Sequence, residues 1–283
     1  MKTFNYYKHF PVDPEHPTLY MGLQPIPANE WIQIDTAYKE QLHYKEVLFE
    51  KDPALVSALG GDPTAERELL FFLSENLPRS YPTFFSKKGN LFSNQITGRD
   101  YSLEEVSFSE FWIGNVQEDV CLLKESNSEH RLISGIVAFP SQWSLSDKLG
   151  KTSDEIHEPV PFFQEKIARQ TNIFLNKIKE GIFYERFNWT LHPSTELHCP
   201  RPLIKKRVSL NQIDSIILNC YLRVERQVLF ALPVTNALVF TIKTYLNPIR
   251  ELSLSEFSTL QEAIHNLSPR SLTYKGILTD ADV

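Results

Sequence analysis

The sequence is poor in cysteine. Its 283 residues include three, Cys121, Cys199 and Cys220, and none of them forms a CxxC pair. A small, odd number of cysteines argues against a disulfide framework, and iron–sulfur clusters usually require a full set of thiolates. We therefore expect a reduced, cytoplasmic protein that does not hold an iron–sulfur cluster by itself.

Long apolar runs are also lacking. Residues 1–20 carry Lys2, Lys8, Asp13 and Glu15 and no continuous apolar stretch, so we expect no signal peptide. No segment approaches the roughly 20 apolar residues that a membrane span needs. The sequence therefore predicts a protein that does not enter a membrane.

Positive charge is not in excess. The net charge is −6, and the one dense basic run, residues 205–207, is interpreted as a solvated loop. We therefore expect no nucleic-acid partner. The patterns GxGxxG, GxxxxGK[ST], GxSxG and HExxH are absent too. The sequence therefore gives no motif evidence for dinucleotide binding, a P-loop nucleotide site, an α/β-hydrolase or a zinc protease.

The N-terminal part of the sequence predicts an arm followed by helices. Residues 1–30 are rich in proline and aromatic side chains and indicate an extended arm. A helix is predicted over 36–50 with Asp35 as N-cap, and a second from Asp62-Pro63 to just before Pro78. The first hundred residues are therefore interpreted as a helical lobe.

The remainder predicts strands with helices around them. Residues 131–139, 215–230 and 236–246 read as strands, 164–180 as a helix ended by Gly181, and Ser253 with Glu256 as the capping box of a last helix. The predicted strands, which we expect to be antiparallel, are flanked by helices and indicate an α+β fold. We expect an arm and helical lobe over 1–105, packed on a core domain over 106–283 as one compact unit.

The segment IHEPVP at 156–161 holds the first candidate for chemistry. Pro159 and Pro161 restrict the backbone and favour extended conformations at Glu158 and Val160. His157 would then end a stiff stretch that can hold an imidazole in one direction, as an axial ligand requires. The alternative is a histidine that simply forms hydrogen bonds in a loop.

A second candidate is the strand segment YLRVERQ at 221–227. Alternation places Arg223, Glu225 and Gln227 on one polar face, which either lines a pocket or is the solvated side of the sheet. Arg226 falls on the apolar side. Because a buried arginine is costly unless paired, we expect its partner to be a carboxylate or a bound anion.

Other groupings are weaker. Residues 184–189 and 240–245 interleave a cation with aromatics, which suits a flat anionic ligand or equally an ordinary half-buried strand. Glu118 and Asp119 are neighbours whose side chains usually point apart, so a shared-proton pair is not expected. His192 and His198 near Cys199 are a weak signal for zinc.

Several motifs together carry a resemblance to a known family. In chain order they are Trp31 with Asp35 and Tyr38, Gln117-Glu118-Asp119, Phe139-Pro140-Ser141-x-Trp143, KLG at 148–150, IHEPVP at 156–161, Arg186-x-Asn188-Trp189, RVERQ at 223–227, Leu232-Pro233, FTIKTY at 240–245 and Tyr274-Lys275-Gly276. From about residue 20 onward, the chain resembles the α (haem-binding) subunit of the haem-dependent oxidative N-demethylases.

The resemblance implies a PAS-like fold that binds b-type haem (haem b). It also implies oxidation, with O2, of an N-methyl group on a small secondary amine, releasing formaldehyde. His157 would be the proximal iron ligand, and Glu225 or Glu118 would bind or deprotonate the amine. Tyr245 is a weaker candidate for the distal side. The remaining cofactor-binding candidates, mainly for the haem propionates, are Arg186, Trp189, Arg223, Arg226 and Lys243.

The resemblance further implies partner subunits, because electrons in that family come from NADPH through a flavin and an iron–sulfur centre borne by other chains. The leading hypothesis is therefore a haem-dependent oxidoreductase that borrows electrons from a reductase partner. The alternatives are a haem-binding sensor or carrier without turnover, and a haem-free structural relative.

Overall fold

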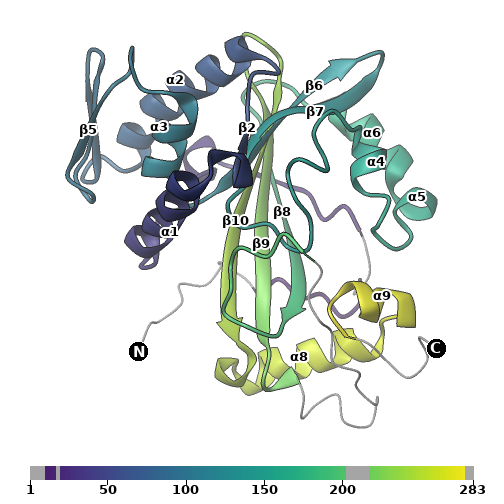
Figure 1. Cartoon of the computed structure of the whole chain (residues 1–283). Helices are drawn as coiled ribbons and strands as arrows, with labels where there is room; N and C mark the ends of the chain where they lie inside the picture. Colours follow the sequence, from purple (N-terminus) through teal and green to yellow (C-terminus); the bar gives the residue numbers. More distant parts are fainter. Residues whose placement is uncertain (1–9, 17–19, 202–216, 278–283) are drawn as a thin grey trace.

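The fold is built on a long antiparallel sheet with helices on both sides (Figure 1). A computed structural model describes residues 10–16, 20–201 and 217–277, so the basic run at 205–207 lies outside the described residues. The sheet has seven strands in the order β1-β8-β9-β10-β6-β7-β2. Their bounds are β1 Gln24–Ile26, β2 Ser57–Ala58, β6 Asp119–Ser126, β7 Glu129–Ile136, β8 Phe183–His192, β9 Tyr221–Ala231 and β10 Leu238–Pro248.

Helices and a second, small sheet surround this centre. The small sheet is the meander β3 Phe85–Lys88, β4 Leu91–Asn94 and β5 Arg99–Ser102. The α-helices are α1 Tyr38–Lys51, α2 Pro63–Ser80, α3 Phe108–Asn115, α4 Ser153–Ile156, α5 Phe163–Lys166, α6 Ala168–Leu175, α8 Leu254–His265 and α9 Pro269–Tyr274. Short 3₁₀ turns are η1 Ala28–Glu30, η2 Pro53–Leu55 and η4 Ile249–Glu251. In Figure 1, α1–α3 flank one side of the sheet and α4–α6 the other, with α8 and α9 at the lower end.

The main hydrophobic core lies between the sheet and α1–α3. Trp31 sits at its centre, where its ring centroid is 5.0 Å from that of Phe230. Phe183 stacks beside them, 4.4 Å from Phe230. Aromatic side chains of this size bury the largest apolar areas available to a protein. The sheet face carrying these rings is therefore committed to packing, and the opposite face is the one available for a site.

The predicted α+β class is confirmed, and several predicted elements are present. α1 and α8 occur where expected, and the capping box of Ser253 and Glu256 begins α8. The N-cap of α1 is Ala37 rather than Asp35, whose carboxylate instead accepts from the Ala37 backbone N–H at 2.9 Å. The finer PAS-like assignment and the boundary near residue 105 stay predictions. β1 and β2, which come from the first 105 residues, nevertheless complete the two edges of the sheet.

Two predicted helix ends were wrong. α2 does not stop before Pro78 but continues to Ser80. A proline in the last turn removes only one hydrogen bond, so the helix tolerates it there. The helix predicted over 164–180 is broken at Ile167, where φ is −133°, and ends at Leu175. At the break, Ile167 packs in a small cluster with Phe163 and with Met21 of the N-terminal arm, beside the cavity described below.

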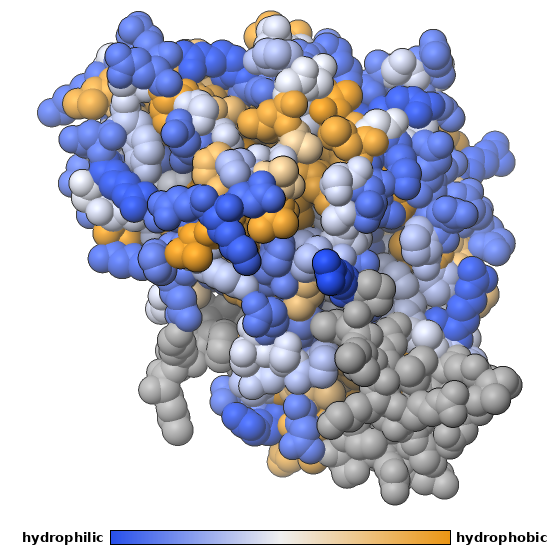
Figure 2. All heavy atoms as spheres, viewed as in Figure 1, coloured by the Kyte–Doolittle hydropathy of each residue, from blue (hydrophilic) through white to orange (hydrophobic). Residues whose placement is uncertain are grey.

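The interpretation of the first hundred residues as a purely helical lobe was incomplete. It missed the meander β3–β5, whose strands are four residues long and mostly polar and so give no clear alternation. Among the described helices, none is both long and apolar enough to cross a bilayer. The face in Figure 2 is mostly hydrophilic, with apolar patches between the polar side chains.

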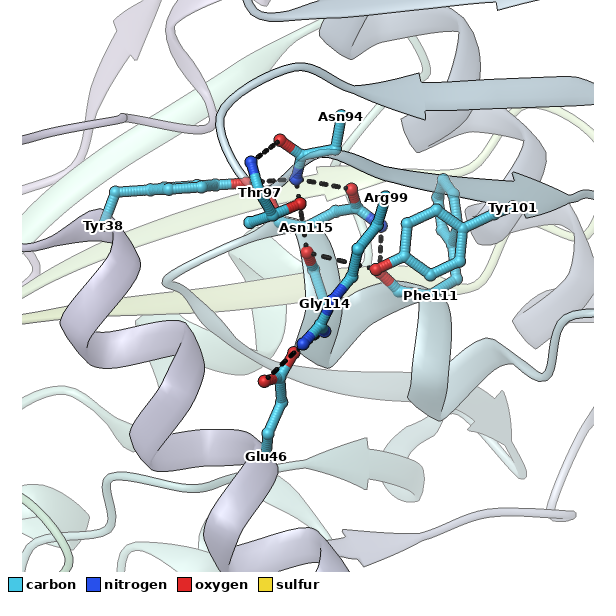
Figure 3. Close-up of polar contacts among 9 residues, drawn as sticks. All are labelled: Tyr38, Glu46, Asn94, Thr97, Arg99, Tyr101, Phe111, Gly114 and Asn115. Atoms are coloured by element: carbon cyan, nitrogen blue, oxygen red, sulfur yellow. Dashed lines mark hydrogen bonds and ion pairs between the residues drawn. The ribbon is translucent and has the colours of Figure 1, made fainter.

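A buried polar network joins this meander to α1 and α3 (Figure 3). Asn94 is 1% exposed, and its Nδ2 lies 2.9 Å from the Tyr38 hydroxyl and 3.0 Å from Asn115 Oδ1. Its Oδ1 accepts from the backbone N–H groups of Ile96 and Thr97. One amide therefore satisfies polar groups from three separate elements.

Replacing the Asn94 side chain should weaken the attachment of the β3–β5 meander to α1 and α3. Asn94→Ala leaves several buried donors and acceptors unpaired, each costing about 1–3 kcal/mol, so we expect a loss of at least about 2 kcal/mol in the free energy of unfolding. Urea unfolding followed by circular dichroism measures it. Asn90→Ala, on the exposed tip of the same meander, is the control; equal stability of the two variants would contradict the role given to Asn94.

Candidate functional site

A cavity of about 470 Å³ opens on the sheet face opposite the main core. Its wall is formed by strands β8–β10 and β6, by the α4–α6 region, by the end of α9, and by the N-terminal arm. Cofactor and small-molecule pockets in proteins usually measure roughly 300–1,000 Å³. The space is therefore of the size that a prosthetic group or substrate occupies.

The cavity has an apolar end and a polar end, and strand register places them. Cys121, Phe240 and Leu229 are paired in one row across β6, β10 and β9 and line the apolar end. Two rows away, Asn188 of β8 is paired with Glu225 of β9 at the polar end. Such a split suits an amphipathic ligand, with its apolar body on one side and its polar groups on the other.

His157 lines this cavity and is held in a fixed orientation. It is the C-cap of α4, with φ −94° and ψ 6°, so the extended backbone predicted around it is wrong: the chain turns here. Its ring stacks on Phe163 with centroids 4.5 Å apart and planes 10° from parallel. Nδ1 lies 2.7 Å from the Ser153 carbonyl oxygen.

This hydrogen bond fixes the tautomer of the imidazole. A carbonyl oxygen only accepts, so Nδ1 carries the proton and Nε2 keeps its lone pair. Burial lowers the pKa of His157 to about 4, and the nearby positive charges of Arg186 and Lys148 act in the same direction. The ring is therefore neutral at physiological pH, which is the state that binds a metal.

Arg186 is a cation at the cavity wall without an acidic partner among the described residues. The side chain comes from β8, and its terminal nitrogen donates to the Tyr20 carbonyl oxygen at 3.3 Å. Its Nε is buried and has no hydrogen-bond partner. A buried donor left unpaired is costly, so this guanidinium fits an anionic group in the cavity.

Glu225 is the cavity's carboxylate on β9. One of its oxygens lies 3.6 Å from Arg223 Nε, and the other accepts from the Gln227 side chain at 3.2 Å. Asn188, Tyr274 and Lys275 share the polar end with it. A carboxylate among polar groups at the end of an otherwise apolar cavity suits a small cationic ligand such as an alkylammonium.

Three of the cations expected to meet propionates have other contacts and do not line the cavity. Arg226 Nε is paired with Glu185, and its other nitrogens donate to the carbonyls of Glu30 and Trp31. The partner of this buried arginine is thus a carboxylate, one of the two outcomes predicted. The other two engage polar atoms as well: Arg223 donates to the carbonyls of Phe139 and Leu197, and Lys243 pairs with Asp35 at 3.1 Å and donates to the Gln33 carbonyl.

The remaining predicted residues are Trp189, Tyr245 and Glu118. Trp189 lines the cavity, although register pairs both Trp189 and Tyr245 with Val224 and so places them on one face of the sheet. Tyr245 and Glu118 lie on the core side, where both contact Gln33: the Tyr245 hydroxyl donates to its side-chain oxygen, and a Glu118 oxygen accepts from its backbone N–H at 2.8 Å. The structure therefore brings His157, Arg186, Trp189 and Glu225 to one cavity. Arg223 contacts Glu225 from behind this lining, and Arg226, Lys243, Tyr245 and Glu118 lie apart from it.

Sequence reasoning missed Lys275 and Tyr274 as residues of the site. Both line the cavity from the end of α9. Lys275 Nζ donates to the Trp189 carbonyl oxygen at 2.6 Å and lies 4.5 Å from the centroid of the Trp189 ring. The motif Tyr274-Lys275-Gly276 was part of the resemblance, but no periodicity or spacing linked it to residues on β8.

The fold and cavity together define an α+β protein built around an amphipathic, cofactor-sized pocket that presents a neutral imidazole and an arginine. The sequence matches the family model described as "Haem-dependent oxidative N-demethylase, alpha subunit-like" over residues 22–283, and the chain belongs to that family. The family's name indicates dependence on haem, and its alpha-subunit designation suggests assembly with other subunits. The lining residues fit haem by their own chemistry: an apolar surface, a free imidazole nitrogen and an unsatisfied guanidinium.

The low pKa of His157 has a measurable consequence for the haem-free protein. Because the folded pKa, about 4, lies below the ordinary 6.5, the unfolded state binds more protons between these values. The stability of the wild-type protein should fall as the pH drops from about 6.5 towards 4. The stability of His157→Gln should fall less steeply over the same range. Thermal unfolding across this range tests the difference between the two proteins, which should be constant above pH 6.5. Parallel curves throughout would contradict the low pKa.

Proposed function

We propose that this chain is the haem-binding subunit of an oxidative N-demethylase and removes an N-methyl group from a small amine with O2. The observation that carries the proposal is the placement of the His157 imidazole and Arg186 in one amphipathic cavity. Family membership supports the same reading. Neither feature would be needed in a purely structural relative.

His157 would hold the iron through Nε2. The Ser153 carbonyl and the Phe163 ring keep the imidazole from rotating, which is the usual function of groups behind a metal-binding histidine. Arg186 would hold a propionate, and Phe240, Leu229 and their neighbours would cover the macrocycle. The sequence has no CxxCH attachment pattern, so we propose a non-covalent b-type haem.

When bound, haem supplies the O2 chemistry by which the N-methyl carbon is oxidised, with formaldehyde and the demethylated amine as products. Glu225 would bind the ammonium form of the amine and take up its proton on a carboxylate oxygen. The apolar wall around Leu229 and Phe240 would exclude bulk water from the reacting end. Electrons would come from a flavin or iron–sulfur centre on a partner subunit.

The first test concerns the iron ligand. The purified protein mixed with haemin should develop a Soret band typical of a histidine-bound haem. His157→Ala should shift or abolish it, because the only nitrogen that we assign to the iron is gone. His130→Gln, which alters a buried histidine outside the cavity, is the control. If His157→Ala and wild type gave the same spectrum, His157 would not be the ligand.

The second test concerns the amine. With an electron donor supplied, the haem-loaded protein should release formaldehyde from at least one member of a panel of secondary methylamines. Glu225→Gln should retain haem but raise the KM for the amine about tenfold or more, since a charge-assisted hydrogen bond is lost. Glu118→Gln, on the other sheet face, should behave like wild type. Unchanged kinetics in Glu225→Gln would remove the amine-site assignment, and absence of formaldehyde with every amine would indicate binding without turnover.

A further inference from the structure

We propose that Lys275 and Arg186 form a carboxylate-binding site at the polar end of the cavity. The proposal rests on the proposed function in one respect: the carboxylate belongs either to a haem propionate or to a substrate that is an N-methylated amino acid. Both sources present the same chemical group, and the experiment below separates them.

Lys275 is fixed in place by the backbone around it. It caps the C-terminus of α9, and its carbonyl oxygen accepts from the Leu191 backbone N–H at 2.8 Å. Gly276 follows with φ +104°, and a Cβ there would collide with the Leu191 carbonyl oxygen. The chain therefore needs glycine at 276, and the close backbone contact directs Lys275 towards β8.

The ammonium group of Lys275 has no charged partner among the described residues. The side chain is buried, with 8% exposure, and Nζ donates to Asn188 Oδ1 at 3.1 Å and to the Trp189 carbonyl at 2.6 Å. An ammonium carries three donors, so one is left for a ligand. Asn188 and Trp189 supply only partial charges, which do not balance a buried cation.

Arg186, at the same end of the cavity, also has no acidic partner among the described residues. Within the described part of the chain its buried Nε has no hydrogen-bond partner, and the one hydrogen bond of its side chain goes to the Tyr20 carbonyl oxygen. Glu225, the carboxylate at this end of the cavity, already contacts both Arg223 and Gln227. Asp13, the other carboxylate in the cavity lining, contacts His16 at 3.0 Å. At the polar end two cations thus face one engaged carboxylate, Glu225, and a further anion would balance them.

The electrostatics agree with this geometry. Burial, and then the positive charge of Arg186, lower the pKa of Lys275 to about 7, while Glu225 opposes them only in part. Tyr274, beside Lys275, stays neutral because burial raises its pKa to about 12. A carboxylate bound between Lys275 and Arg186 would stabilise both charged forms.

The first arm of the experiment uses metal-free protoporphyrin IX and its dimethyl ester, so that iron ligation plays no part. Quenching of tryptophan fluorescence in the full-length protein reports binding. If the anion is a propionate, Lys275→Gln should weaken protoporphyrin IX about tenfold or more and leave the ester within about twofold. Lys275→Arg should restore most of the loss, and Lys151→Gln, an exposed lysine, should change neither ligand.

The second arm uses N,N-dimethylglycine and dimethylamine, measured by calorimetry with the same proteins. If the anion is a substrate carboxylate, Lys275→Gln should weaken dimethylglycine about tenfold or more while dimethylamine and both porphyrins bind as before. Arg186→Gln should reproduce whichever pattern Lys275→Gln gives. It also serves as the second variant if Lys275→Gln does not fold, as judged by circular dichroism.

The outcomes separate this proposal from the function it rests on. A selective loss in either arm supports the site and names its source. Equal affinities of wild type and variants for all four ligands overturn it. If wild type binds haemin no more tightly than protoporphyrin IX, the assignment of His157 as the iron ligand fails and the anion site is unaffected. If wild type binds neither porphyrin, the haem proposal fails and the second arm alone decides the role of Lys275.

Discussion

The alternation of side chains along β8, β9 and β10 is the constraint on which both the core and the cavity depend. Glu225 faces the cavity, whereas its neighbour Arg226 faces the core and is tied to Glu185 and to the segment around Trp31. In register, Glu225 lies between Asn188 and Thr244. A slip of one residue would exchange the two faces, exposing a paired arginine to the cavity and burying a carboxylate among aromatic rings. The ion pairs on the core side therefore hold the site on the other side in register.

Much of the fold followed from local signals in the sequence, and what did not follow depended on tertiary contacts. The capping box of Ser253 and Glu256 and the β-branched runs of β9 and β10 are local, and the structure has these elements close to where they were expected. The start of β9 was predicted too early, because residues 217–220 precede the strand, which begins at Tyr221. The break at Ile167 lies in a cluster that Met21 of the N-terminal arm also joins, and the sequence around Ile167 does not reveal that distant contact. The β3–β5 meander is attached by the polar contacts of Asn94 with α1 and α3 and by Phe85 and Phe92 in the main core, which no window of sequence reveals.

The candidate site was predictable residue by residue but not as an arrangement. Sequence could identify His157, Arg186 and Glu225 as residues capable of binding chemistry, and it could predict that Arg226 would need an anion. It could not tell which cations the protein uses internally, since Lys243 is engaged by Asp35 from more than 200 positions away. Lys275 escaped notice for the same reason: its neighbours Asn188 and Trp189 lie on a strand 86–87 positions earlier in the chain.

The arm that helps to wall the cavity also fixes the order in which the cavity can be completed. The adjoining strand β1 pairs with β8 across 161 positions of the chain. The arm residues that line the cavity are Pro11, Asp13, His16, Tyr20, Met21 and Leu23. During synthesis β1 precedes β8 and cannot pair with it until β8 has left the ribosome, and β8 itself pairs with β9, which follows later still. Contacts so distant in sequence form late in folding. The side of the pocket that the arm lines is therefore completed only after the central strands have paired.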